Sequence, residues 1–140
     1  MRHIAILGLL GLLGSADAAL AAEWVQVSQI SQNIREVDKT SIQGARPVLT
    51  FTSRHVIDDA AEFKVGRNSV KYLVMQQRVD CAKRTTAMLS TEAQRADMST
   101  ISKQKLMAQE DAPVLKDSVD EDVLKFVCGG EKNSSGSRAE

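Results

Sequence analysis

Hydrophobic and polar residues alternate along much of the chain, and this alternation predicts an antiparallel β-sheet. The clearest strand is 48–57, where Leu49 and Phe51 would lie on one face and Thr50 and Thr52 on the other. A period of two is typical of a half-buried strand. Runs rich in β-branched and aromatic residues predict further strands at 23–30, 34–37, 69–81, 84–92 and 100–107.

The run 69–81 is the expected centre of the sheet. Its middle, 72–75, is apolar at every position, which predicts a strand covered on both faces. Only Ala82 and Lys83 separate it from the next run, so the two strands are expected to pair as an antiparallel hairpin. One helical turn is expected near 59–63. Polar or glycine-containing stretches predict turns at 31–33, 38–41, 44–47 and 66–68.

The C-terminal part has the clearest helical periodicity. Its apolar residues form one stripe, at Val119, Val123, Leu124 and Val127. Ser118 and Glu121 have the spacing of a capping box, in which a hydroxyl and a carboxylate accept the free N–H groups of the first turn. Pro113 breaks the chain before this helix, and the glycines at 129–130 suit its end. Five to six short strands followed by one helix predict an α+β fold, with a small antiparallel sheet and the helix packed on it.

The first residues have the pattern of a secretory signal peptide. A basic start is followed by an apolar run at 4–13 and by an Ala-x-Ala site at 19–21. The apolar run has about ten residues, whereas a bilayer span needs about twenty, so cleavage is favoured over an uncleaved anchor. We therefore expect a signal peptide at 1–21, one domain at 22–129 and a disordered tail at 130–140. The protein would be exported, to the periplasm or to the cell surface.

The chain has two cysteines, Cys81 at a predicted strand end and Cys128 in the predicted helix. In an exported protein such a pair is normally a disulfide. This bond would close a loop of about 48 residues and contribute roughly 4 kcal/mol to stability. The alternative, a redox-active pair, usually has a close Cys-x-x-Cys spacing, which is not the spacing here.

Charge gives one candidate binding surface. The formal net charge is zero, which argues against dedicated nucleic-acid binding. Basic residues nevertheless concentrate between 64 and 84, and the alternative is that they are ordinary solvated side chains. The candidate surface consists of Arg67, Lys71, Arg78, Lys83 and Arg84.

Few residues suit catalysis or metal binding. After removal of the signal peptide the single histidine is His55, which alternates onto the apolar face of its strand. A metal site usually collects several such ligands, and no catalytic triad or phosphate-binding glycine loop can be assembled. The carboxylates around 117–122 suit helix capping better than calcium binding. We expect no enzyme activity, no catalytic or metal-binding residues and no cofactor.

Several motifs in order resemble the bacterial surface-adhesin protein E family. They are Trp24 just after the signal, the segment 37–42, the strand from Val48, the triplet 80–82 around the first cysteine, and the pair 127–128 at the end of the helix. The resemblance covers about 24–128. It implies a small antiparallel sheet with a packed helix, a Cys81–Cys128 disulfide and non-enzymatic binding of host or matrix proteins.

Two functions follow from these expectations. The first is an exported adhesin-like binding protein that engages host or matrix protein or a polyanionic ligand through the hairpin around Cys81. The alternative is a periplasmic structural or regulatory protein that binds a partner in its own cell envelope. For both functions we expect a protein partner, no nucleic acid and no stable membrane insertion. The open edges of a small sheet also allow a homodimer.

Overall fold

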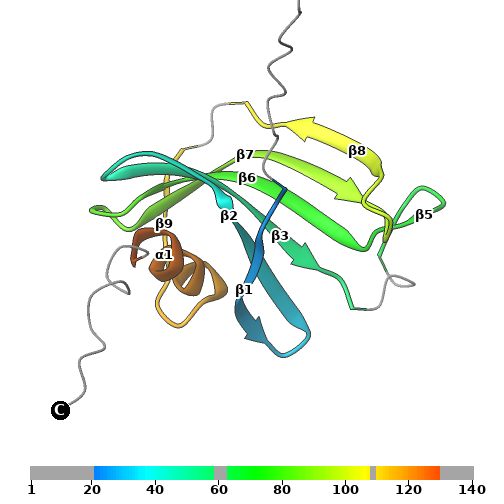
Figure 1. Cartoon of the computed structure of the whole chain (residues 1–140), viewed down its shortest axis with the longest axis horizontal. Coiled ribbons are helices and arrows are strands. Elements are labelled where there is room, and N and C mark those ends of the chain that lie inside the picture. Colours follow the sequence, from blue (N-terminus) through cyan, green and yellow to red (C-terminus); the bar gives the residue numbers. More distant parts are fainter. Residues whose placement is uncertain (1–20, 59–62, 108–109, 130–140) are drawn as a thin grey trace, which may run out of the picture.

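One curled antiparallel sheet and a single helix make up most of the described structure (Figure 1). The computed structural model describes residues 21–58, 63–107 and 110–129. Within these ranges the main sheet has the strand order β1-β2-β3-β6-β7-β8, and the predicted fold class is confirmed. Its strands are β1 (Trp24–Ile30), β2 (Asn33–Ala45), β3 (Val48–Val56), β6 (Tyr72–Asp80), β7 (Thr85–Gln94) and β8 (Thr100–Lys105).

Three short strands complete the described sheet structure. A small separate hairpin is formed by β4 (Lys64–Val65) and β5 (Asn68–Ser69), around the turn predicted at 66–68. The third short strand, β9 (Ala112–Pro113), pairs with the start of β7. Pro113 therefore ends a two-residue strand, whereas the sequence predicted only a chain break there.

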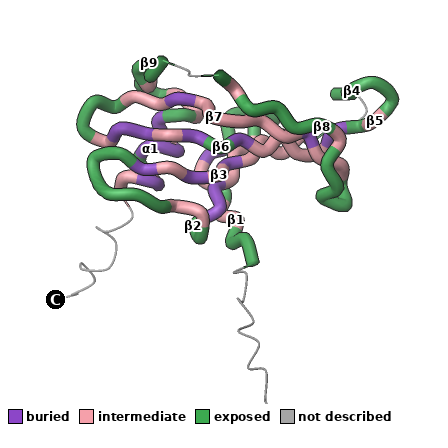
Figure 2. Tube along the Cα trace, turned by 90° about the horizontal axis from the view of Figure 1, so that it is seen from above, coloured by how far each residue is buried: buried purple, intermediate pink, exposed green. Residues whose placement is uncertain are grey.

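The helix α1 (Val119–Gly129) packs against β1 and β2, and its apolar stripe closes the core. The predicted hairpin of β6 and β7 is confirmed by their antiparallel register. Figure 2 shows buried residues gathered in the strands that lie over α1. The core cluster consists of Val37, Leu49, Phe51 and Val79 from the sheet and Val123, Leu124 and Val127 from the helix.

The predicted corner at 38–41 is wrong, because these residues lie inside β2. The register between β2 and β3 shifts between Asp38 and Gln43, so the irregularity is a bulge within a longer strand. The Asp38 carboxylate accepts hydrogen bonds from the Thr40 N–H at 3.0 Å and the Glu23 N–H at 3.0 Å. Local side-chain bonding of this kind is the expected turn chemistry, but here β2 and β3 stay paired on both sides of it.

The disulfide between Cys81 and Cys128 is present, with the two Cα atoms 5.8 Å apart and a sequence separation of 47. It joins the turn after β6 to the last turn of α1 (Figure 1). The signal peptide, the helical turn near 59–63 and the C-terminal tail fall wholly or mostly outside the described residues, so these expectations stay predictions.

Candidate binding surface

The sheet face opposite α1, called the outer face below, is defined by alternate residues of the strands. In β3, Leu49 and Phe51 are buried toward the helix, whereas Thr50, Thr52 and Arg54 lie on the outer face. Side chains alternate between the faces of a strand, so this assignment extends across each paired neighbour. No second helix covers the outer face in the part of the chain that the structure describes.

The outer face contains a groove over β6, β7 and β8. It has a volume of about 510 Å³, and we call it the bulge groove because a β-bulge shapes it. The register of β6 and β7 shifts by one residue at Leu89. Because of this extra residue, Leu89 and Ser90 both line the groove, although consecutive residues of a regular strand point to opposite faces. The lining residues are Gln76, Arg78, Leu89, Ser90, Lys103, Lys105 and Leu106.

The strand β8 closes one side of the groove through its register with β7. Lys105 is opposite Ser90 in this register, and Lys103 is opposite Glu92. The strand ends at Lys105, and the Leu106 N–H donates to the Leu89 carbonyl at 2.9 Å. This hydrogen bond holds two leucines beside the lysines. The groove therefore combines cationic side chains with apolar walls.

Two of the three cations in the groove are paired with carboxylates. Arg78 donates to Asp111 at 2.8 Å, and Lys103 lies 3.4 Å from Glu92. Among the described residues Lys105 forms no ion pair. The net charge of these five side chains is therefore positive but small.

Glu92 is fixed in its position beside the groove. It accepts hydrogen bonds from Gln94 Nε2 at 2.9 Å and from Thr100 Oγ1 at 2.5 Å. These two bonds, helped by the charge of Lys103, hold the pKa of the Glu92 carboxyl below its usual value of 4.5. It is thus a stable negative charge that orients Lys103 at neutral pH.

Elsewhere on the outer face, Arg54 lies between two aromatic rings. Its guanidinium carbon is 4.1 Å from the Trp24 ring centre and 4.4 Å from the Tyr72 ring centre. Arg54 Nε also donates to Glu36 Oε2 at 2.6 Å. The sheet pairing brings these residues together from four strands. The covering of both faces predicted for 72–75 is wrong, because Tyr72, Leu73 and Val74 are only half-buried.

The five residues predicted as a binding surface are spread over the whole length of the central strand. Arg67 is exposed in the β4–β5 turn, and Lys71 donates to the Ile57 carbonyl at 3.0 Å just before β6. Lys83 and Arg84 are exposed at the opposite end of β6, a strand of nine residues or roughly 30 Å. Only Arg78 lines the bulge groove. The five side chains therefore do not form one cluster, and a role in binding stays a prediction for each.

Three residues of the groove were not predicted from the sequence: Lys103, Lys105 and Leu89. The two lysines are two residues apart in a run that was predicted as a strand, so the sequence does place them on one face. Their position beside Arg78 depends on the order and register of three strands. The bulge at Leu89 has no signal in the sequence, because no glycine marks it.

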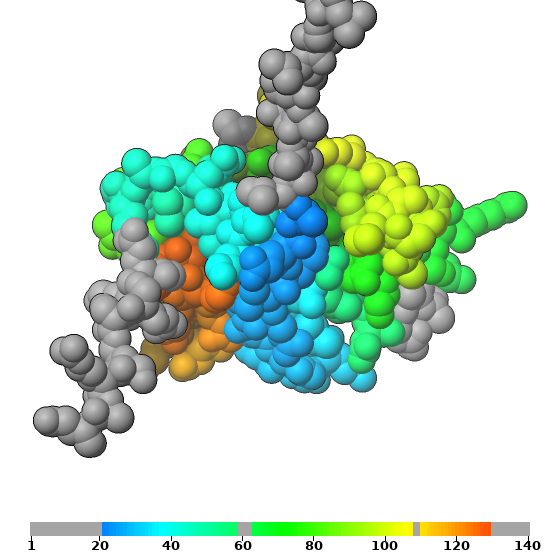
Figure 3. Space-filling view, in the orientation of Figure 1, coloured from blue at the N-terminus to red at the C-terminus, as the bar shows by residue number. Residues whose placement is uncertain are grey.

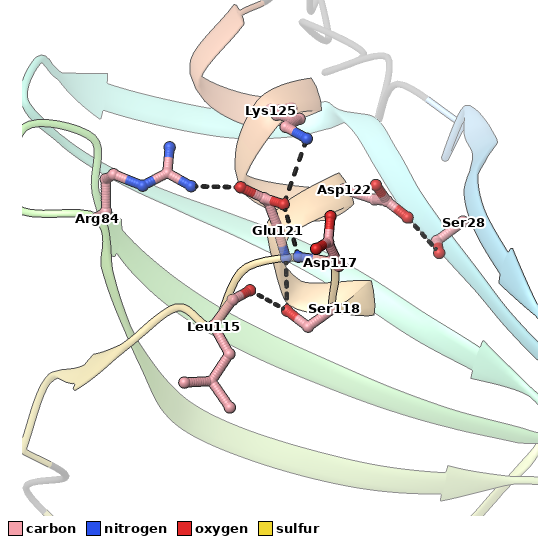
Figure 4. Close-up of polar contacts among 8 residues, drawn as sticks. All are labelled: Ser28, Arg84, Leu115, Asp117, Ser118, Glu121, Asp122 and Lys125. Carbon is pink, nitrogen blue, oxygen red and sulfur yellow. Dashed lines mark hydrogen bonds and ion pairs between the residues drawn. The ribbon is translucent and has the colours of Figure 1, made fainter.

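A polar network joins the helix start to the sheet (Figure 4). Ser118 Oγ accepts from the Glu121 N–H at 3.2 Å, as the capping box predicts, but the Glu121 carboxylate accepts from the Asp117 N–H at 2.9 Å. The same carboxylate pairs with Arg84 at 2.7 Å. Ser28 Oγ in β1 donates to Asp122 at 2.6 Å. Arg84 thus has a structural partner at the hairpin end.

His55 and Arg35 are cross-strand neighbours on the helix-side face of the sheet. Burial, and secondly the charge of Arg35, lower the pKa of His55 below its usual value of 6.5. Burial also lowers the pKa of Arg35, although Asp120 opposes this shift. Within residues 21–58, 63–107 and 110–129, no group of three or more His, Cys, Asp or Glu side chains could hold a metal ion.

Comparison with known proteins places this fold. The sequence model of the family described as surface-adhesin protein E matches residues 24–129, which is most of the chain. The chain belongs to the surface-adhesin protein E family. The resemblance inferred from the motifs is thereby confirmed. No relative was found among curated proteins.

Solved structures of Haemophilus influenzae protein E share the fold of this family member. Crystal form II of that protein has 10% identity and a TM-score of 0.52, with 79% of this chain and 98% of that chain covered. A selenomethionine form has 12% identity and a TM-score of 0.51, with coverage of 79% and 93%. Similarity at this level of identity shows the fold alone. Among the described residues, no helix is long and apolar enough to cross a membrane.

Proposed function

We propose that the chain is an exported, non-enzymatic binding protein that contacts a protein partner through its outer face, with the bulge groove at the centre of the contact. The groove is the observation that carries this proposal. It places Arg78, Lys103 and Lys105 beside two leucines on the sheet face opposite the helix. Family membership supports an adhesin-like role and disfavours an enzymatic one.

The composition of the outer face suits protein recognition. Arginine and aromatic residues contribute more to binding energy than other residues at protein interfaces, and Arg54, Trp24 and Tyr72 form one cluster on this face. Exposed cations raise the rate of encounter with an acidic partner. A polyanionic ligand would use the same cations, so host or matrix protein and polyanion are the two ligand classes to compare.

The first experiment locates the protein and then tests its outer face. Antibody against the mature chain is applied to intact cells and to permeabilised cells. We expect labelling of intact cells, followed by binding of the oxidised mature chain to a member of a matrix-protein panel. Arg78→Glu should weaken that binding, and Lys64→Glu, an equal charge change in β4 outside the main sheet, should leave it unchanged.

Two results would count against the proposal. Labelling only after permeabilisation would favour a periplasmic partner in the same cell. Binding of a matrix protein that Arg78→Glu and Lys105→Glu leave unaltered would move the contact away from the bulge groove.

A further inference from the structure

We propose that the free edge of β8 takes up an extended acidic segment of a partner protein as an added strand. Acidic side chains of this segment would pair with Lys103 and Lys105, and an apolar side chain would pack against Leu106 at the mouth of the bulge groove. This assignment rests on the proposed function and names the chemistry of the partner.

The first support is the position of β8 at the end of the sheet. In the described part of the chain β8 pairs with β7 alone, so its other edge carries backbone groups without strand partners. Five of its six residues are exposed, and Ile101 is half-buried. The yellow atoms of β8 lie at the surface in the space-filling view (Figure 3). An exposed edge of this kind is a template for an added strand.

The second support is the spacing of the lysines. Lys103 and Lys105 lie on one face of β8, two residues and roughly 7 Å apart. A strand added at this edge would repeat the same spacing between its alternate side chains. Glutamates at alternate positions would then lie opposite the lysines, where pairs of opposite charge stabilise a sheet.

The charge of β8 also selects among occupants. Lysines on an edge strand discourage pairing between two copies of one protein, because like charges would lie opposite each other. A second copy of this chain joined edge to edge through β8 is therefore disfavoured. An acidic strand removes the repulsion and gains attraction.

A protein segment suits this site better than a dense polyanion. Glu92 and Asp111 already neutralise two of the three cations, so the groove has too little net positive charge to hold a run of sulfates or phosphates by charge alone. The half-buried Leu89 and Leu106 and the backbone edge are of no use to such a ligand. A peptide uses all three features, since it offers carboxylates, an apolar side chain and backbone hydrogen bonds.

The test uses the oxidised mature chain and a short acetylated peptide in which glutamates and one central leucine alternate with threonines. Binding is measured by calorimetry at low salt, and hydrogen exchange of the β8 amides is followed by NMR. We expect binding that slows exchange of β8 amides. Lys103→Glu and Lys105→Glu should each weaken binding by about fivefold, since an exposed ion pair is worth up to about 1 kcal/mol.

Three controls make the result specific. Lys64→Glu should bind the peptide as the parent does. The same peptide with N-methylated amides should fail, because it cannot add to a strand edge. A heparin fragment should not displace the peptide. Thermal unfolding of each variant confirms that it is folded. Equal binding of the methylated peptide, an unchanged affinity in Lys105→Glu, or displacement by heparin would each overturn the proposal.

Failure of this inference can be separated from failure of the proposed function. If a matrix protein binds and is lost in Arg78→Glu while the peptide does not bind, only the acidic-strand assignment fails. If the peptide binds at β8 but intact cells are not labelled and no matrix protein binds, the adhesin-like function fails and the β8 site stands.

Discussion

Arg84 Nη2 donates a 2.7 Å hydrogen bond to Glu121 Oε1, and this ion pair joins the turn after β6 to the first turn of α1 (Figure 4). The Arg84 side chain is 50% exposed, but that of Glu121 is only 9% exposed. Glu121 also accepts from the Asp117 N–H and lies 3.3 Å from Lys125. One carboxylate therefore holds the hairpin, the helix start and the next helical turn together.

The first prediction concerns the acid stability that Glu121 provides. The hydrogen bond from the Asp117 N–H holds the pKa of Glu121 below its usual value of 4.5, and the positive charges of Lys125 and Arg84 lower this pKa to a smaller extent. A carboxyl with a depressed folded-state pKa adds stability above the unfolded value, and this stability is lost as pH falls through the folded value. The free energy of unfolding should therefore fall more steeply below about pH 4.5 in the parent than in Glu121→Gln.

Urea unfolding at a series of pH values checks this expectation. Glu110→Gln removes an exposed carboxylate and is the matched control for the loss of one negative charge. Glu92 and Asp97 also have lowered pKa values, but they contribute equally to the parent and to Glu121→Gln. Parallel curves for the parent and Glu121→Gln would contradict the role assigned to this carboxylate.

The second prediction concerns the disulfide. Replacing Cys81 and Cys128 with serine removes a bond between residues with a sequence separation of 47. The chain-entropy argument gives a loss of about 4 kcal/mol in the free energy of unfolding. This is a large share of the 5–15 kcal/mol typical of a domain. Chemical denaturation of the double variant should match that of the reduced parent, and a loss below about 1 kcal/mol would show that the disulfide contributes little to the stability of the domain.

The third prediction concerns Arg54. Its planar guanidinium fits between Trp24 and Tyr72, and a lysine would keep the charge but lose this stacking. Arg54→Lys should lower the free energy of unfolding by about 1–2 kcal/mol, because the side chain is only 12% exposed. Urea unfolding followed by the fluorescence of Trp24, the single tryptophan, measures the loss. Arg67→Lys, in an exposed turn, is the control and should have no effect.

Local patterns in the sequence predicted the elements, because period-two alternation and helical spacing are properties of neighbouring residues. Leu49 and Phe51 alternate in β3, and Val123 and Val127 recur in α1, as predicted. The Cys81–Cys128 pairing also followed from sequence, since a chain that is expected to be exported and has two cysteines can form only one intramolecular disulfide.

The bulge groove could not be predicted, because it depends on register. The shift at Leu89 becomes visible only when β6 and β7 are paired, and it decides which side chains share the outer face. The contact of Arg54 with Trp24 likewise needs the order of β1, β2 and β3. The basic residues of 64–84 were a candidate surface because they are close in sequence, but residues close in sequence are spread out along a strand: Arg67 and Arg84 lie at opposite ends of β6.

The last prediction concerns His55, which is the one histidine among the described residues. Burial and the neighbouring Arg35 both disfavour the charged imidazole, so its folded-state pKa lies below 6.5. The unfolded chain then binds a proton at a higher pH than the folded chain does. His55 therefore contributes stability above about pH 6.5, and this contribution declines as pH falls through 6.5 toward the folded value. Titration of its ring protons by NMR should give a midpoint below 6.5, and Arg35→Gln should raise that midpoint because one of the two causes is removed. A midpoint at or above 6.5 in the parent would mean that neither burial nor Arg35 acts on this side chain.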